Sequence, residues 1–205
     1  LVYFANPMCS WCWGFAPVVR HVRQAYAGRL EMVLALGALG DRTRPMREKD
    51  KEYVRGHWEH VHALTGQPFD HAFFDREGYV YDTERPSRAV AVVRERWPDL
   101  AIPFLERLHE RFYARNEDIT DPALLADAAG EFGMAADEFG EAWESEAMRT
   151  LVARELQEVA ALGVTGYPTL LALGHGKPRV LALGCRPKDQ VVAELDAWLD
   201  GSPAG

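Results

Sequence analysis

The chain lacks the features that mark several large classes of protein. It has only three cysteines in 205 residues, too few to hold a fold of this length together by disulfide bonds. No apolar run approaches the ~20 residues that cross a bilayer, and no charged leader with an apolar segment begins the chain. Positive charge is scarce, with 23 Lys and Arg against 31 Asp and Glu. We therefore expect a cytoplasmic protein that binds neither membranes nor nucleic acid.

The remaining composition is typical of a globular protein in water. Hydrophobic residues make up 48% of the chain and charged residues 26%. The length is large for one minimal core and small for two full domains. An acidic surface, with a net charge of -8, favours solubility. Composition indicates neither the substrate nor the oligomeric state.

Two of the cysteines form a motif, Cys9-Ser10-Trp11-Cys12, between an apolar run at residues 1–4 and an amphipathic run at residues 15–26. This pattern predicts a strand, a tight turn and a helix that starts at Cys9. Free N–H groups and the helix dipole favour a thiolate there, and a thiolate is the nucleophile of thiol–disulfide exchange. We expect Cys9 to be exposed, and Cys12, one turn later, to be protected and able to close a disulfide. A structural cysteine pair or half of a zinc site is the alternative, but a CxxC at this junction is typical of redox motifs.

Apolar periodicity predicts four strands and a series of helices. The strands are expected at residues 1–5, 31–36, 170–173 and 179–183, with a turn at 174–177, and the helices at residues 10–27, 53–65, 87–97, 102–115, 122–132, 137–144, 146–162 and 188–199. Neither end of the chain alone has enough strands to bury a sheet. The sequence therefore predicts an α/β fold in which residues 1–40 and 147–205 form one discontinuous domain. Residues 41–146 form an inserted all-helical domain.

A second motif, Gly163-Val164-Thr165-Gly166-Tyr167-Pro168-Thr169, precedes the third strand. Together with the CxxC, the proline inside the first helix and the helical insertion, it resembles the DsbA-like family of the thioredoxin fold. The resemblance is to the FrnE-like branch, described as predicted disulfide isomerases. It implies a thioredoxin-like fold and a protein dithiol–disulfide oxidoreductase or isomerase. Its partners would be protein or peptide thiols and disulfides, with no cofactor beyond the redox-active disulfide and with glutathione as a candidate co-substrate.

The same resemblance assigns roles to individual residues. It implies that Cys9 is the attacking thiol, Cys12 the resolving thiol and Pro168 the cis-proline beside them. Family members often bury a carboxylate in the first strand beneath the resolving cysteine, but Tyr3 occupies that position here. The sequence therefore names no proton acceptor for Cys12.

Four residues are expected to form the substrate surface. A cis bond at Tyr167-Pro168 would leave the Tyr167 N–H and C=O facing outward beside Cys9, where an extended substrate could pair as an added strand. A trans bond in an ordinary loop is the alternative. Ser10 and Trp11, in the turn between the cysteines, complete this surface, with Trp11 facing solvent and the neighbouring Trp13 packed.

Other candidate sites and functions are weaker. His57 and His60 share a helix face, but no metal-binding spacing is present, so we expect no metal site. Cys185, just after the last strand, is expected near Cys9 as a packing residue or an auxiliary thiol. One alternative function is that of glutathione-dependent kappa-class transferases or hydroxychromene carboxylate isomerases, which typically carry Ser at the first active-site position and lack the second cysteine. The other is a binding or chaperone module in which the thiols are incidental.

Overall fold

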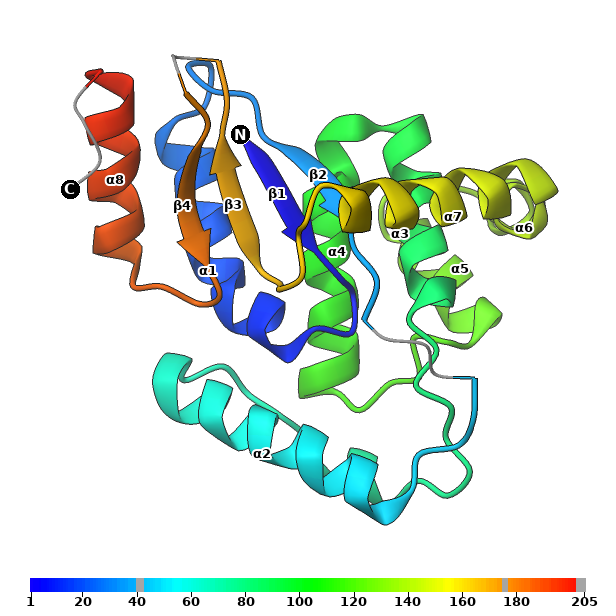
Figure 1. Cartoon of the computed structure of the whole chain (residues 1–205). Helices are drawn as coiled ribbons and strands as arrows, with labels where there is room; N and C mark the ends of the chain where they lie inside the picture. Colours follow the sequence, from blue (N-terminus) through cyan, green and yellow to red (C-terminus); the bar gives the residue numbers. More distant parts are fainter. Residues whose placement is uncertain (40–42, 175–176, 202–205) are drawn as a thin grey trace.

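A four-stranded mixed sheet, in the order β2-β1-β3-β4, forms the centre of the molecule (Figure 1). The structure is a computed structural model that describes residues 1–39, 43–174 and 177–201. β1 runs parallel to β2 and antiparallel to β3, and β3 is antiparallel to β4. The bounds are Val2–Ala5 for β1, Val33–Leu36 for β2, Thr169–Ala172 for β3 and Arg179–Leu183 for β4. The sequence prediction located all four strands, and the two ends of the chain do share one sheet.

Eight α-helices are present in the described chain. They are α1 (Ser10–Ala25), α2 (Glu48–Thr65), α3 (Glu84–Arg96), α4 (Ala101–His109), α5 (Pro122–Gly130), α6 (Ala136–Glu144), α7 (Glu146–Ala161) and α8 (Lys188–Leu199), with 3-10 turns at His71–Asp75 and Pro98–Leu100 and a π-helical turn at Glu110–Ala114. α1 lies between β1 and β2, α2 to α7 lie between β2 and β3, and α8 follows β4. Within the described ranges, none of them combines the length and apolar character needed to cross a bilayer.

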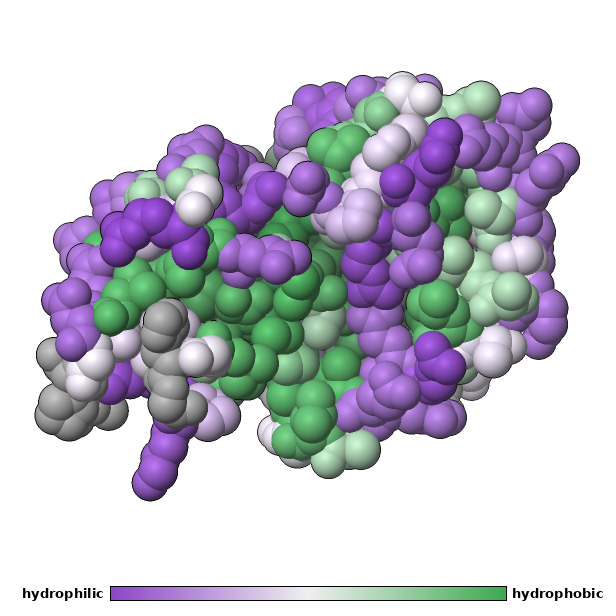
Figure 2. Space-filling view, turned by 90° about the horizontal axis from the view of Figure 1, so that it is seen from above, coloured by the Kyte–Doolittle hydropathy of each residue, from purple (hydrophilic) through white to green (hydrophobic). Residues whose placement is uncertain are grey.

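One face of the sheet is buried against α1. Tyr3 of β1 pairs with Leu34 of β2 and Leu170 of β3, and side chains in one such row point to the same face. All three are buried, and the Tyr3 ring centroid lies 6.4 Å from that of Phe15 in α1. α8 packs against β4. Val2 of β1 and Val33 of β2 form the next row, whose side chains point to the opposite face of the sheet, and Val33 is exposed. Seen from above, the molecule has a broad apolar area where β1 begins (Figure 2).

β2 is an edge strand, and an ion pair occupies two of its outward backbone hydrogen-bonding groups. Arg94 of α3 donates two hydrogen bonds, of 2.7 and 2.6 Å, to the carboxylate of Glu155 in α7. Arg94 also donates to the Leu34 carbonyl at 3.1 Å, and Glu155 accepts from the Leu36 N–H at 2.8 Å. The pair thereby prevents another strand from adding at this edge.

The start of α2 differs from the sequence prediction. The helix begins at Glu48, within the charged segment that shows no apolar period. Asp50 accepts from the Arg47 N–H at 2.9 Å and pairs with the Arg44 guanidinium at 2.8 Å. Polar capping, which apolar periodicity does not register, therefore sets this helix start.

α3 also begins earlier than predicted. Ser87, expected at its start, lies inside the helix, where its hydroxyl donates to the Thr83 carbonyl at 2.7 Å. The predicted boundary at residues 40 and 41 and the centre of the predicted turn, residues 175–176, lie outside the described residues. The division into two domains stays a prediction.

Candidate active site

Asn6 organises the turn between β1 and α1. Its side-chain oxygen accepts from the Met8 N–H at 2.8 Å, and its amide nitrogen donates to the Gly37 carbonyl at 2.7 Å. Its backbone carbonyl accepts from the Cys9 N–H at 3.1 Å and from Nε2 of His109 at 3.0 Å. Asn6 is fully buried. These bonds hold Cys9 at the start of α1.

Cys9 is the N-cap residue of α1. Its sulfur accepts the Cys12 N–H at 3.3 Å, and its S–H donates to the Tyr167 carbonyl at 3.4 Å. The free N–H groups and the dipole at a helix start stabilise negative charge on such a sulfur. Cys9 is only 5% exposed, so the prediction of an exposed side chain is wrong: α2 and the Tyr167 loop crowd the sulfur.

Cys12 lies behind Cys9 and is 0% exposed, as predicted for the protected thiol. All three cysteines are free thiols. Burial raises the pKa of Cys12 well above its ordinary value, and the hydrogen bond to Cys9 and the charge of Cys9 add to this rise. Hydrogen bonds from the Asn6 backbone and the Tyr3 side chain lower it in part. Cys12 therefore keeps its proton in the reduced protein.

The loop before β3 faces the two cysteines. The Tyr167–Pro168 peptide bond is cis, and the Tyr167 carbonyl points toward Cys9, as the sequence suggested. Pro168 is buried, and its carbonyl accepts the Gly184 N–H at 2.8 Å. The Tyr167 ring lies directly against the backbone of Gly37, because a Cβ added at Gly37 would come within 2.0 Å of it.

Cys185 follows Gly184, which is hydrogen-bonded to the cis-proline. It is partly buried, and burial raises its pKa, with a further rise from the charge of Cys9. Cys185 thus lies near Cys9, as predicted. Its role as a packing residue or as an auxiliary thiol stays a prediction.

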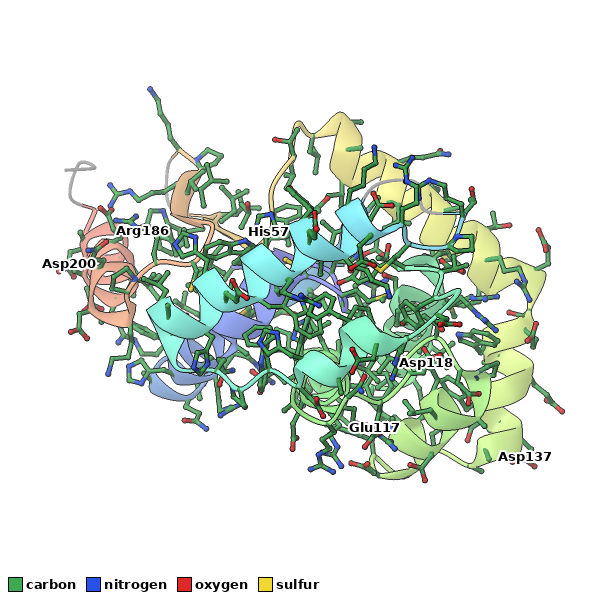
Figure 3. The ribbon with its side chains drawn as sticks, turned by 90° about the horizontal axis from the view of Figure 1, so that it is seen from below. His57, Glu117, Asp118, Asp137, Arg186 and Asp200 are labelled. Carbon is green, nitrogen blue, oxygen red and sulfur yellow. The ribbon has the colours of Figure 1, made fainter. Side chains whose placement is uncertain are left out.

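Trp11 packs on α2 and does not face solvent freely, which corrects the sequence prediction. Its indole N–H donates to Nδ1 of His57 at 3.1 Å, and its ring lies 5.1 Å from that of His60. Burial lowers the pKa of His57, with a smaller effect from His60, and a neutral imidazole can accept this bond. Seen from below, α2 crosses in front of α1 and carries His57 (Figure 3). α2 therefore covers the turn between the cysteines.

Trp13 is buried, as predicted, and helps to fix the loop after α2. Its indole N–H donates to the Pro68 carbonyl at 3.0 Å. Pro17 has no N–H to bond the Trp13 carbonyl within the helix, and the side chain of Gln67 donates to that carbonyl at 2.9 Å instead. The proline in α1 thus leaves a carbonyl free to bind the loop that follows α2.

A pocket of about 280 Å³ opens beside the Cys9 sulfur. Its walls come from the CxxC turn, α2 and the cis-proline loop, and most are apolar or aromatic. The described residues that line it are Met8, Cys9, Ser10, Trp11, Leu39, Tyr53, Val54, His57, Tyr81 and Tyr167. Ser10 is itself buried, with 8% of its surface exposed. Lysine and arginine are absent from this described lining.

His109, at the end of α4, supports the turn between β1 and α1 by its hydrogen bond to Asn6. It lies where α4 passes into the π-helical turn, a kind of irregularity that is frequent at functional sites. Burial lowers its pKa to about 4, so the ring is neutral and donates from Nε2 to the Asn6 carbonyl. The described residues contain no cluster of three or more His, Cys, Asp or Glu that could hold a metal ion.

A family model, the DSBA-like thioredoxin domain, matches residues 1–196. The chain belongs to this DsbA-like family. A solved structure from Nitrosomonas europaea, provisionally described as a protein disulfide isomerase, is similar with a TM-score of 0.89 and 32% identity over 98% of both chains. The cytosolic disulfide reductase DsbM from Pseudomonas aeruginosa, also solved with GSH, is similar with a TM-score of 0.79 and 27% identity over 98% of both chains.

Curated relatives are more distant. The ClpXP adapter protein SpxH from Halalkalibacterium halodurans is 22% identical over 174 residues, which is 82% of this chain and 56% of the relative. SpxH from Bacillus subtilis is similar, at 21% identity over 168 residues. The chain therefore spans about half the length of the curated relatives it matches.

In this DsbA-like chain, the six residues predicted for the site lie together: Cys9, Ser10, Trp11 and Cys12 from the turn, and Tyr167 and Pro168 from the loop opposite. The sequence prediction missed Asn6, Gly37 and His109. Asn6 had a visible signal, because Asn before Pro marks a turn that side-chain hydrogen bonds stabilise. Gly37 and His109 are distant in sequence from both motifs, and only the fold brings them to the site.

Proposed function

We propose that this protein catalyses dithiol–disulfide exchange on protein or peptide substrates, with Cys9 attacking and Cys12 resolving. One observation carries the proposal: the Cys9 sulfur caps α1 between the Cys12 N–H and the Tyr167 carbonyl, beside a pocket, with the Cys12 thiol buried behind it. The thiol that lines the pocket is thus the one whose negative charge the helix start favours. The second thiol is one helical turn away.

The reaction takes two steps. The Cys9 thiolate attacks one sulfur of the substrate disulfide, the S–S bond breaks, and the other sulfur leaves as a thiolate that takes up a proton. Cys12 then loses its proton and attacks Cys9, which forms the Cys9–Cys12 disulfide and releases the second substrate sulfur, again protonated. The substrate gains two electrons and the protein loses two. Isomerisation follows the same first step when a second substrate thiol, in place of Cys12, displaces Cys9.

The pocket favours a peptide with an apolar or aromatic side chain near its cysteine. Such a side chain would bury apolar surface against Trp11 and Tyr81, while the backbone pairs with Tyr167 as an added strand. The two carboxylates of glutathione would find no lysine or arginine in the described lining. We propose glutathione as the co-substrate that returns the disulfide to the dithiol, and the support is that DsbM has been solved with GSH.

Reduction in the cytoplasm is the direction and location that we propose. The support is DsbM, described as a cytosolic disulfide reductase, at 27% identity over 98% of both chains. Two glutathione thiols would reduce the Cys9–Cys12 disulfide and form glutathione disulfide. A reducing cytoplasm would keep the pair in the dithiol form.

A turnover assay tests this proposal. A peptide disulfide with a fluorescent reporter should be reduced in the presence of glutathione, Cys9→Ser should abolish turnover, and Cys185→Ser, the matched control, should retain it. Cys9-dependent conjugation of glutathione to chlorodinitrobenzene, without peptide reduction, would replace the proposal with a transferase. Neither activity in a folded protein would favour a binding module.

A further inference from the structure

His57 of α2 lines the pocket beside Cys9, although the exchange reaction gives it no role. Its Nδ1 accepts the indole N–H of Trp11 at 3.1 Å. The Tyr53 ring, one turn earlier on α2, makes a T-shaped contact with the imidazole, with the ring centroids 4.6 Å apart. Trp11 and Tyr53 also line the pocket. His57 thus connects two aromatic parts of the pocket wall, one on each helix.

The hydrogen bond to Trp11 fixes the protonation state of His57. An indole N–H can only donate, so Nδ1 must carry a lone pair, and the ring proton lies on Nε2. An imidazolium ion carries a proton on both nitrogens and has no acceptor for the indole. Binding of one proton from solvent at Nδ1 therefore breaks the contact with Trp11.

The packing of α1 on α2 confines this change to Trp11. The two helices lie close together at Gly14, where an added Cβ would come within 2.7 Å of Cγ1 of Val61. Val61 and Trp58 of α2 are fully buried, and neither of them titrates. α2 therefore stays in place when His57 is protonated, and the Trp11 indole is the part of the wall that is released.

The surroundings of His57 contain little charge. The titratable side chains that face it come from its own helix and from the other walls of the pocket, and they are His60, Tyr53, Cys9, Tyr81 and Tyr167. Asp, Glu, Lys and Arg are absent from the described lining of the pocket. Burial lowers the pKa of His57, and the charge of His60 adds to this effect. The bond to Trp11 is therefore present at neutral pH and lost as the pH falls through this pKa.

We propose that His57 is a positioning residue for substrate binding, whose neutral imidazole holds the Trp11 indole in place as one wall of the pocket. This inference rests on the proposed thiol–disulfide exchange and adds the residue that orients Trp11. Protonation of His57 frees the indole, so an aromatic side chain of the substrate loses a fixed surface to pack on. The Cys9 sulfur keeps its bonds to the Cys12 N–H and the Tyr167 carbonyl. Acidification therefore weakens peptide binding through the Trp11 wall.

The first test follows the Trp11 indole by NMR in reduced protein with isotope-labelled tryptophan and histidine. Trp11→Phe assigns its indole cross-peak among the six tryptophans. On acidification this cross-peak should move upfield together with the titration of His57, at a midpoint below the ordinary pKa of histidine. His57→Asn places a side-chain oxygen near the position of Nδ1 and does not titrate, so the cross-peak should stay downfield at every pH. His57→Phe, which has no acceptor, should hold it upfield.

His60→Asn is the matched control for this titration. It removes the neighbouring imidazole, which contacts the Trp11 ring edge-on at 5.1 Å. The coupled movement of Trp11 and His57 should persist, with its midpoint raised because the charge of His60 lowers the pKa of His57. A Trp11 cross-peak that does not follow His57, or that loses its pH dependence in His60→Asn, overturns the inference.

The second test measures KM for a peptide disulfide with an aromatic residue beside its cysteine. His57→Phe should raise KM about fivefold at neutral pH with little change in kcat, as expected for the loss of one neutral hydrogen bond. His57→Asn should restore the wild-type KM and remove its rise at acidic pH. An unchanged KM in His57→Phe overturns the inference. The NMR titration needs no substrate, so a Trp11 wall that follows His57 in a protein without peptide reduction would reject the proposed function and retain the contact.

Discussion

Gly37→Ala should disable the site without touching either cysteine. Gly37 follows β2, and its backbone is held on both sides: its N–H donates to the Ala5 carbonyl at 3.0 Å and its carbonyl accepts from the Asn6 side chain at 2.7 Å. A Cβ at this position would lie 2.0 Å from the Tyr167 ring. Because the Gly37 backbone is fixed, the ring has to move.

The displacement follows from ordinary contact distances. Carbon atoms pack at about 3.5 to 4 Å, so the ring must shift by roughly 1.5 Å or more. The Tyr167 carbonyl lies only 3.4 Å from the Cys9 sulfur, so a ring displacement that is passed on to the backbone breaks this contact. We expect overpacking to cost about 1–3 kcal/mol of unfolding free energy and misplacement to slow exchange by up to about 100-fold.

The assay pairs peptide-disulfide reduction with urea unfolding. Gly56→Ala is the control, since Gly56 lies on the exposed face of α2 and an added Cβ meets nothing within 4 Å. That change should raise stability by about 0.5–1 kcal/mol and leave the rate unchanged. Gly37→Ala with wild-type stability and a rate within about twofold of wild type would refute the reasoning, since a 1 Å misplacement alone should cost far more.

Three further outcomes are expected. Iodoacetamide at mildly acidic pH should modify Cys9 much faster than the fully buried Cys12, and equal rates in a mass-spectrometric time course would contradict the helix-start argument. The pKa of His109 is about 4 in the folded protein against 6.5 unfolded, so only the unfolded chain binds a proton between these values. Unfolding free energy, measured in urea, should therefore be unaffected above about pH 6.5 and fall by ~3 kcal/mol toward pH 4, and His109→Gln should flatten this fall. Glu155→Gln leaves Arg94 without its carboxylate and should cost about 3 kcal/mol of unfolding free energy, whereas a loss below about 0.5 kcal/mol would show that the pair does not stabilise the fold.

The two motifs and the strands could be predicted because their signals are local. Short apolar runs mark the strands, and a CxxC after the first of them places Cys9 at a helix start. The cis-proline was expected because its motif and the CxxC together resemble the DsbA-like family. These features depend on a few neighbouring residues, and the sheet brings them together once four strands are identified.

The burial of Cys9 and the packing of Trp11 could not be predicted in the same way. Both depend on where α2 lies across α1, and that placement rests on contacts such as Trp11 with His57, 46 residues apart. The start of α2 was missed because polar capping by Asp50 leaves no apolar period. Tertiary contacts and a polar cap therefore set the burial of Cys9, the packing of Trp11 and the start of α2, and none of these leaves a signal in the apolar periodicity.

The most direct test of the account is covalent trapping at the attacking thiol. Cys12→Ser protein is incubated with a peptide disulfide whose cysteine neighbours an aromatic residue, quenched with acid and mapped by mass spectrometry. We expect a mixed disulfide between the peptide and Cys9 that persists because the resolving thiol is gone, and no such species with Cys9→Ser. A peptide attached to Cys185 instead, or normal turnover by the Cys12→Ser protein, would contradict it.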